Sequence, residues 1–182
     1  QRINTTFLYV THDQTEAMTL GDRIVIMKDG YIQQIGTPQE VFNHPVNVFV
    51  AGFIGTPQMN FFKARLVKDG EGAYHVQVGE ISVALAESVQ KALNTDSQEV
   101  ILGIRPEHIQ LSAGAVENGL TGRLRYVEDY GNKRGAYISL GGEEVVCMCD
   151  RLPCAPGGTV SFRLESGRIH LFSRTTTDSL GY

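Results

Sequence analysis

The sequence of 182 residues lacks several features that would assign it directly to a class of protein. It contains no tryptophan and only 8% aromatic residues, and its three cysteines are an odd number without the spacing of a disulfide framework. This cysteine usage is typical of a reducing compartment. No run of about 18 apolar residues occurs, so we expect no membrane-spanning helix. The first residues also lack the basic and then apolar pattern of a secretory signal peptide, and we expect none here.

An excess of basic charge is absent as well. The chain has 16 Lys and Arg residues against 20 Asp and Glu residues, which gives a net charge of −4. A general polyanion binder carries a basic excess on one face, so the charge balance argues against that class. What is present is a globular composition, with 42% apolar and 20% charged residues. The length is sufficient for one ordinary domain or two small ones.

The first part of the chain, residues 1–55, mixes strand and helix patterns. The apolar run 7–10 predicts a short buried strand. Asp13, with Glu16 three residues later, has the spacing of a capping box and predicts a helix that runs to Leu20. We therefore expect an α/β segment here.

A hairpin and two helices complete this α/β segment. Asp29-Gly30 lies between two strand-like runs, and this dipeptide is the strongest short-range signal of a β-hairpin. Thr37 is a candidate N-cap, followed by proline at the first helical position, for a helix that stops before Pro45. Apolar residues at helical spacing predict another helix over 46–54.

The second part, residues 56–182, has the pattern of an all-β domain. Short strand-like runs alternate with turns that contain Gly, Asp or Asn, which predicts a small barrel or sandwich. One short helix is expected at 88–93. The expected strands are 74–78, 81–85, 100–104, 120–127, 136–140, 145–148, 160–164 and 169–172.

His12 is the first candidate for a chemical role. It lies just after the expected strand and just before the expected helix, and in α/β sheets ligands bind at such positions. Helix N-termini favour anions, and a neutral imidazole can donate a hydrogen bond to a phosphate oxygen. On position alone, a histidine that merely satisfies a loop carbonyl is the more frequent case.

The wider sequence around His12 resembles a known family. The residues that carry the resemblance are THDQTEAMTLGDRIVIMKDGYIQQIGTPQEVFNHPVNVFVAGFIG (11–55), the pair Phe61-Phe62, the segment 103–108 and the segment 168–172. They resemble the C-terminal half of ATP-binding subunits of ABC importers, in the branch that transports maltose and glycerol phosphate. The resemblance implies that 1–55 is the C-terminal part of a nucleotide-binding domain. It also implies that 56–182 is a regulatory domain of OB-type strands, called TOBE.

The same resemblance implies roles for His12 and for partners. His12 is then the switch-loop histidine, both a catalytic and a nucleotide-binding residue, which contacts the γ-phosphate of ATP and helps to place the attacking water. The longer protein would use ATP and Mg²⁺, form a homodimer and act on membrane permease subunits at the cytoplasmic face of the membrane. The transported solutes would be carbohydrates or related compounds.

The motifs that hold a nucleotide are missing from these 182 residues. There is no G-x-x-x-x-G-K-[ST] phosphate loop, no LSGGQ-like signature and no strand that ends in Asp-Glu ahead of His12. The phosphate loop and its lysine supply the strongest contacts to a triphosphate. We therefore expect no cofactor bound to this segment and no ATP hydrolysis by it alone. We also expect several apolar side chains to lose part of their cover, which favours self-association. They are Ile24, Ile26, Val41, Phe42, Phe49, Val50 and Phe53.

Further residues are candidates for interface or metal roles. Arg105, Pro106, Glu107 and His108 form the segment that the resemblance assigns to the regulatory interface, and Arg105 and Glu107 are close enough in sequence for a local ion pair. Cys147, Cys149 and Cys154 lack zinc-site spacing, so we expect apolar packing and no metal site. His44 is expected to interact with the end of a helix.

Two other functions are compatible with the sequence of the β domain. The β domain could be a stand-alone sensor of an oxyanion or a sugar, as related TOBE modules are for molybdate, although no oxyanion nest is evident. OB-type strands can also bind nucleic acid, but such domains use a basic groove with stacking aromatic residues. Acidic residues outnumber basic ones after position 60, so we expect no nucleic-acid partner.

Overall fold

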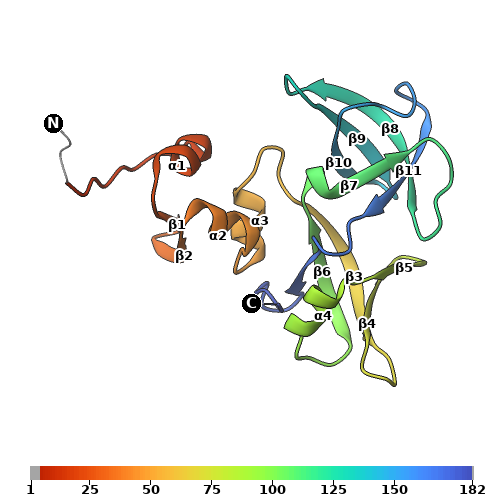
Figure 1. Cartoon of the computed structure of the whole chain (residues 1–182), viewed down its shortest axis with the longest axis horizontal. Coiled ribbons are helices and arrows are strands. Elements are labelled where there is room, and N and C mark those ends of the chain that lie inside the picture. The colour runs from red at the N-terminus through yellow and green to blue at the C-terminus, as the bar shows by residue number, and fades with distance from the viewer. Residues whose placement is uncertain (1–4, 182) are drawn as a thin grey trace.

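The computed structural model describes residues 5–181 and consists mostly of antiparallel β-sheets with a few short helices (Figure 1). A small α/β part comes first, and two five-stranded sheets follow it. The fold class predicted from the sequence, an α/β segment followed by a β-rich region, is confirmed. The elements of the α/β part are α1 (Gln14–Leu20), β1 (Ile24–Lys28), β2 (Tyr31–Gly36), α2 (Pro38–Asn43) and α3 (Val48–Phe53).

The hairpin and the following helix form as the sequence predicts. Asp29 and Gly30 connect β1 to β2 with φ angles of 52° and 83°, the left-handed conformation that this turn requires. Thr37 caps α2 in a reciprocal capping box: its hydroxyl accepts from the Glu40 N–H, and the Glu40 carboxylate accepts from the Thr37 N–H. These local signals are strong because each needs only residues close in sequence.

The predicted strand at 7–10 is wrong. Phe7, Leu8, Tyr9 and Val10 are 65% to 92% exposed and do not form a strand. In Figure 1 this segment extends away from the rest of the molecule. A β-strand needs a partner for its backbone hydrogen bonds, and none of the described strands pairs with it. Apolar composition alone therefore misled the prediction.

The helix predicted over 46–54 is shorter and less buried than expected. It spans Val48–Phe53, with Asn47 as its N-cap, and buries Val50 and Ala51. Ile54, just after the helix, is buried as predicted, but Phe53 is 44% exposed. The small core of the α/β part consists of Ile24, Ile26, Val41, Val50 and Ile54.

The first large sheet has the strand order β12-β6-β3-β4-β5. Its longest run of paired residues joins β6 to β3, a strand that the sequence analysis did not identify. The signal was an alternation in which Phe62, Ala64 and Leu66 face the core and Lys63 and Arg65 face solvent. The elements are β3 (Asn60–Lys68), β4 (Tyr74–Val78), β5 (Ile81–Ala84), α4 (Glu87–Ala92), β6 (Gln98–Ile104) and β12 (His170–Ser173).

The second large sheet has the strand order β10-β9-β8-β11-β7 and shares one core with the first (Figure 1). The short strand β7 was also not predicted. Fully buried side chains of both sheets meet in this core, and no sheet within residues 5–181 closes into a barrel. The elements are the 3₁₀ helix η1 (Pro106–His108), β7 (Ile109–Ser112), β8 (Leu120–Asp129), β9 (Arg134–Leu140), β10 (Glu143–Cys149) and β11 (Thr159–Leu164).

A buried asparagine joins the two large sheets. Asn60, 7% exposed, begins β3, and its side-chain Nδ2 donates to the carbonyl oxygens of Val146 on β10 and Ile104 on β6, at 2.8 and 3.3 Å. Its Oδ1 accepts from the Val146 N–H at 2.7 Å. One amide therefore supplies backbone-like hydrogen bonds between strands that are far apart in sequence.

We predict that Asn60→Ala lowers the free energy of unfolding by about 2–4 kcal/mol, because it leaves the backbone groups of Val146 without their partner in the interior. Urea denaturation followed by circular dichroism measures this. Asn94→Ala, at an exposed loop position, is the matched control and should change stability by less than about 0.5 kcal/mol. Equal effects of the two substitutions would contradict the role given to Asn60.

Candidate functional site

His12 lies exposed directly ahead of α1, between two residues that are held in place. Asp13 caps the helix by accepting from the N–H groups of Thr15 and Glu16, at 2.8 and 3.2 Å, so the predicted N-cap is confirmed. On the other side of His12, the Thr11 hydroxyl accepts from the Asp13 N–H at 3.0 Å. The imidazole is thus presented to solvent from a fixed stretch of backbone.

Glu16 does not complete the capping box that its spacing suggested. Its carboxylate instead accepts from the hydroxyl groups of Thr11, at 2.8 Å, and Tyr9, at 3.2 Å. Because Thr11 already occupies the Asp13 N–H, the carboxylate has no need to reach back to that donor. The result is a chain of hydrogen bonds from Tyr9 to Asp13 around His12.

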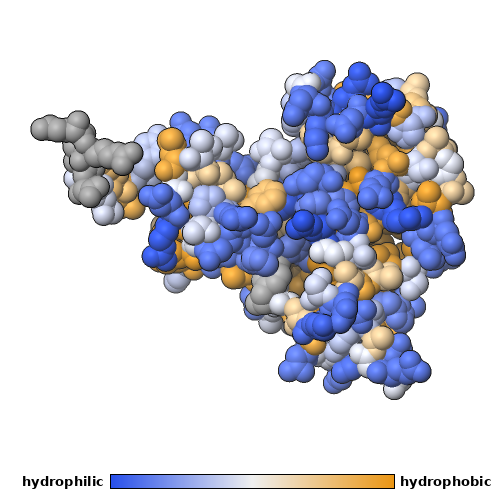
Figure 2. Space-filling view, viewed as in Figure 1, coloured by the Kyte–Doolittle hydropathy of each residue, from blue (hydrophilic) through white to orange (hydrophobic). Residues whose placement is uncertain are grey.

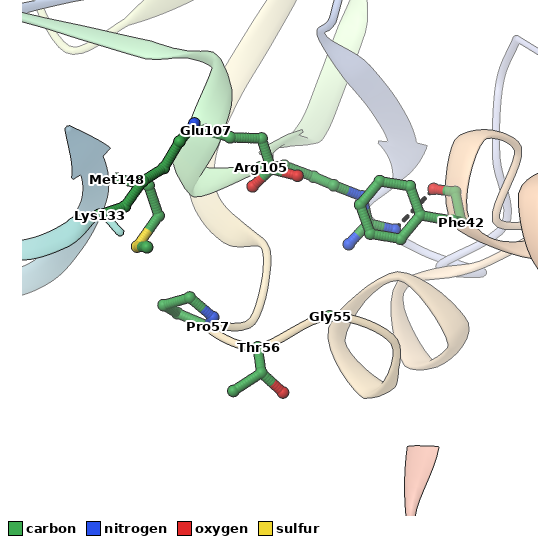
Figure 3. Close-up of a pocket in the computed structure, with 8 residues that line it drawn as sticks. All are labelled: Phe42, Gly55, Thr56, Pro57, Arg105, Glu107, Lys133 and Met148. Atoms are coloured by element: carbon green, nitrogen blue, oxygen red, sulfur yellow. Dashed lines mark hydrogen bonds between the residues drawn. The ribbon is translucent and has the colours of Figure 1, made fainter. Parts of the chain in front are cut away.

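Arg105 connects the α/β part to the β sheets. It follows β6, and only 2% of its surface is exposed. Its Nη1 donates to the carbonyl oxygen of Ile54 at 2.7 Å and its Nη2 to that of Phe42 at 2.6 Å. The guanidinium also stacks over the Phe42 ring, with Cζ 3.7 Å from the ring centroid (Figure 3). The ion pair predicted with Glu107 is replaced by these contacts to backbone carbonyls.

Gly55 allows the linker between α3 and β3 to pass close to this arginine. It has a φ of +117°, and a Cβ atom at this position would lie 2.9 Å from Arg105 Nη1. An L-amino acid side chain is strained at such a φ angle, and here it would also collide with a buried cation. The sequence Gly55-Thr56-Pro57 therefore makes a linker that only glycine permits at its first position.

A cavity of about 410 Å³ lies where these parts meet. Figure 3 shows the linker along one side, Arg105 and Phe42 along another, and residues of the second large sheet opposite. It is lined by Phe42, Gly55, Thr56, Pro57, Arg105, Glu107, Lys133 and Met148. The cavity contains both a carboxylate and an ammonium group, so its lining has no single sign of charge.

The rest of the predicted interface segment lies near Arg105 with differing exposure. Pro106 is buried, Glu107 is exposed and His108 is half-buried. Burial lowers the pKa of His108, an effect that nearby Glu107 partly opposes. His108 Nδ1 is buried without a hydrogen-bond partner among the described residues. The structure brings these four residues together, and their role in regulation stays a prediction.

The structure also places the remaining candidate residues. Cys147 is buried, and its thiol lies 3.0 Å from the Ile109 carbonyl oxygen, whereas Cys149 and Cys154 are half-buried. Burial raises the pKa of Cys147 to about 12, so this thiol stays protonated. His44 forms the C-cap of α2, where its N–H donates to the Glu40 carbonyl oxygen. This agrees with the helix-end position predicted for it.

Sequence reasoning missed Gln14, the first residue of α1. Its side chain contacts the linker 41 residues away: Oε1 accepts from the Gly55 N–H at 2.7 Å, and Nε2 lies 3.2 Å from Thr56 Oγ1. No local signal marks such a residue, because both partners depend on how α3 ends. Gln14 thus joins the His12 segment to the same linker that Arg105 contacts from the other side.

Comparison with family models assigns the two β regions. Residues 55–109 match the MalK OB fold domain, and residues 102–172 match the TOBE domain. The two matches overlap at β6 and η1, the position of Arg105. The chain thus contains a MalK OB fold region and a TOBE region, and it is similar to ABC transporter ATP-binding proteins over nearly its whole length.

Three relatives illustrate this similarity. The chain is 41% identical over 177 residues to an uncharacterised ABC transporter ATP-binding protein, y4oS, of Sinorhizobium fredii, and covers 46% of it. It is 39% identical to the oligosaccharides import ATP-binding protein MsmX of Bacillus subtilis and 38% identical to the sulfoquinovosyl glycerol transport ATP-binding protein SmoE of Agrobacterium fabrum. It covers 49% of each of these two.

These alignments include 97% to 99% of this chain, which therefore spans about half the length of the curated relatives it matches. Among solved structures, the cytoplasmic molybdate-binding protein ModG aligns with 62% of this chain and 94% of its own, with 22% sequence identity and a TM-score of 0.49. Likeness of this extent supports no conclusion about function.

We predict that Arg105→Met lowers the free energy of unfolding by about 2–4 kcal/mol, because the carbonyl oxygens of Ile54 and Phe42 lose a charged donor while the apolar stem is kept. Hydrogen exchange should also become faster in α2 and α3 than in the β sheets. Arg125→Met, at an exposed position on β8, is the control. If hydrogen exchange in α2 and α3 is no faster in Arg105→Met than in Arg125→Met, this link between the α/β part and the β sheets is contradicted.

Proposed function

We propose that this chain is the part of an ABC importer ATP-binding subunit that holds the switch histidine and the regulatory β domains. The similarity to ABC transporter ATP-binding proteins and the position of His12 support this. The histidine is exposed directly before a capped helix, while hydrogen bonds of Thr11, Asp13 and Glu16 hold its neighbours. In the complete subunit, ATP hydrolysis would supply the energy for uptake.

The chemical role of His12 in this proposal is to contact the γ-phosphate of the substrate ATP. A neutral imidazole can donate one hydrogen bond to a phosphate oxygen and help to orient the attacking water. The ordered backbone around His12 reduces the entropy that is lost when the side chain engages the phosphate. Binding of the phosphates is assigned to other parts of the subunit, because these 182 residues contain no phosphate loop.

The Mg²⁺ ion that accompanies ATP does not fit the residues of this chain. No group of three or more His, Cys, Asp and Glu side chains that could hold a metal ion is present within residues 5–181. We therefore assign the ion to other parts of the subunit and derive no step from it here.

The names of the relatives support a carbohydrate or a related solute as the transported compound. One is named for oligosaccharides and another for sulfoquinovosyl glycerol. In this proposal the subunit acts on membrane permease subunits from the cytoplasmic face of the membrane. Within the described part of the chain, no helix is long and apolar enough to cross a membrane.

The β domains would serve dimerisation and regulation. We propose a homodimer, because closed two-fold assemblies are the commonest for soluble subunits. Nucleic acid is not a proposed partner, since the chain carries a net charge of −4. The segment 105–108 lies where the two matched β regions overlap. In this proposal it would couple movements of the β sheets to the α/β part.

We predict that His12→Ala in the complete ATP-binding subunit lowers steady-state ATP turnover at least about a hundredfold while ATP binding is largely kept. The physical reason is that a γ-phosphate contact acts on the hydrolytic step, whereas the phosphate loop provides most of the ground-state affinity. Turnover assays and equilibrium binding of ATP measure the two quantities. The control His75→Ala, in β4, should leave turnover unchanged. Near-normal turnover of the His12 variant would rule out the proposed role.

The exposed apolar side chains that would favour self-association differ in part from those expected. Ile24, Ile26 and Val50 are buried in the small core, and the exposed apolar side chains lie on the opposite side of the hairpin. Figure 2 shows hydrophobic atoms at this position. The most exposed among them are Val25, Met27, Ile32 and Ile35, at 46% to 57%.

We predict that the 182-residue chain self-associates at micromolar concentration through this hairpin, because burial of an exposed apolar side chain stabilises association by about 1.5–3 kcal/mol. Light scattering should show a larger mass for the wild-type chain than for a Met27→Ser, Ile32→Ser variant. If both chains have the same oligomeric mass above that of a monomer, the β domains mediate the association. A monomer in both cases would contradict both contacts.

A further inference from the structure

Gln14 makes a long-range contact that the proposed function does not use. Its side chain is half-buried and bridges from the first turn of α1 to the linker that follows α3. The Gly55 N–H donates to Gln14 Oε1 at 2.7 Å, and Gln14 Nε2 lies 3.2 Å from Thr56 Oγ1 and 3.5 Å from the Gly55 carbonyl oxygen. The shortest of these is a short hydrogen bond from a backbone donor.

The chemistry of the contact requires an amide. The linker offers one donor, the Gly55 N–H, and two acceptors, the Thr56 hydroxyl and the Gly55 carbonyl. A side-chain amide carries both a carbonyl oxygen and an NH₂ group, so it satisfies both kinds of partner at once. A carboxylate can only accept, and an apolar side chain of the same length can do neither.

The other side of the same linker contacts Arg105. Arg105 Nη1 donates to the carbonyl oxygen of Ile54, the residue that precedes Gly55. Three consecutive residues, 54–56, are therefore held by Gln14 from α1 and by Arg105 from the end of β6. Gly55 permits this arrangement, because a Cβ atom there would meet the guanidinium. The linker cannot move from one of its partners without affecting the other.

Few residues connect His12 to this linker, and their backbone is held by hydrogen bonds. Gln14 lies two positions after His12 along the chain, and the intervening Asp13 is fixed as the N-cap of α1. A displacement of the His12 backbone therefore moves the start of α1 and, with it, the Gln14 amide. Rigid elements joined by hydrogen bonds can carry such coupling between sites.

We propose that Gln14 is a positioning residue that couples the placement of His12 to the linker and, through Arg105, to the β domains. The coupling is reciprocal, so a partner or a second subunit that moves the β domains would also shift His12. The functional consequence rests on the proposed role of His12 in hydrolysis. The mechanical link between Gln14, the linker and Arg105 does not depend on that role.

The mechanical link is tested on the 182-residue chain by amide hydrogen exchange. Gln14→Met removes both hydrogen-bonding groups at nearly the same length, and we expect the Gly55 amide to exchange about tenfold faster, as the loss of one net hydrogen bond implies. Thr56→Val removes only the weaker partner and should leave Gly55 exchange within about twofold. Gln77→Met, at an exposed position on β4, is the matched control. Unchanged Gly55 exchange in the Gln14 variant overturns the proposal.

Transmission to the β domains is tested by NMR on the same chain. His12→Ala should shift amide resonances of Gly55 and of residues next to Arg105 when Gln14 is present. In the His12→Ala, Gln14→Met double variant these shifts should be lost. Shifts of equal size with and without Gln14 would mean that another route carries the coupling, and they would overturn the proposal.

The functional consequence is tested in the complete ATP-binding subunit by a double-mutant cycle of Gln14→Met and Arg105→Lys. If both residues act through one linker, the double variant should have at least about fivefold higher turnover than the product of the single effects predicts. Independent, multiplicative effects would overturn the proposal. Normal turnover of His12→Ala would instead refute the proposed function and leave the exchange and NMR results intact.

Discussion

The guanidinium of Arg105 is the interaction on which the arrangement of this chain depends. A buried cation is costly unless it is hydrogen-bonded, so its place in the interior is stable only with carbonyl oxygens directed toward it. Two of these come from the α/β part, at Phe42 and Ile54, whereas the arginine itself belongs to the β region. The cost of an unsatisfied guanidinium thus keeps the two parts in one relative position.

Other features of the junction follow from that constraint. The close passage of the linker requires glycine at position 55, and the Phe42 ring covers the apolar face of the guanidinium. Next to Arg105 along β6, the Ile104 carbonyl accepts from Asn60, which also bonds to the second large sheet. Arg105 and Asn60 therefore form two adjacent connections, one to the α/β part and one between the β sheets.

In the proposed ATP-binding subunit, this arrangement would provide a physical route for communication. The His12 segment and the β domains have no need of a direct contact, because the linker lies between them. The linker is held by neutral and charged hydrogen bonds, both of which depend on distances of about 3 Å. Small displacements at one end would therefore change the contacts at the other. The contact of Gln14 with Gly55 is the element of this path closest to the proposed chemistry.

Much of the local structure could be predicted because it depends on neighbouring residues. The Asp29-Gly30 turn, the capping box of Thr37 and the N-cap Asp13 were all identified, since their partners lie within a few positions. The sequence also indicated the family and singled out His12 and the segment 105–108. The strand predicted at 7–10 failed because pairing requires a partner strand that apolar composition does not reveal.

The sequence by itself determined the fold class, the turns and caps, and the candidate site residues His12 and 105–108. Only the tertiary structure decided which of them interact. Arg105 suggested an ion pair with Glu107 but donates to carbonyl oxygens more than 50 positions away, and Gln14 gave no sign of its linker contact. The physical reason is that a side chain carries its donors and acceptors with it, whereas its partners are set by how distant segments pack. Burial then determines which hydrogen bonds must form.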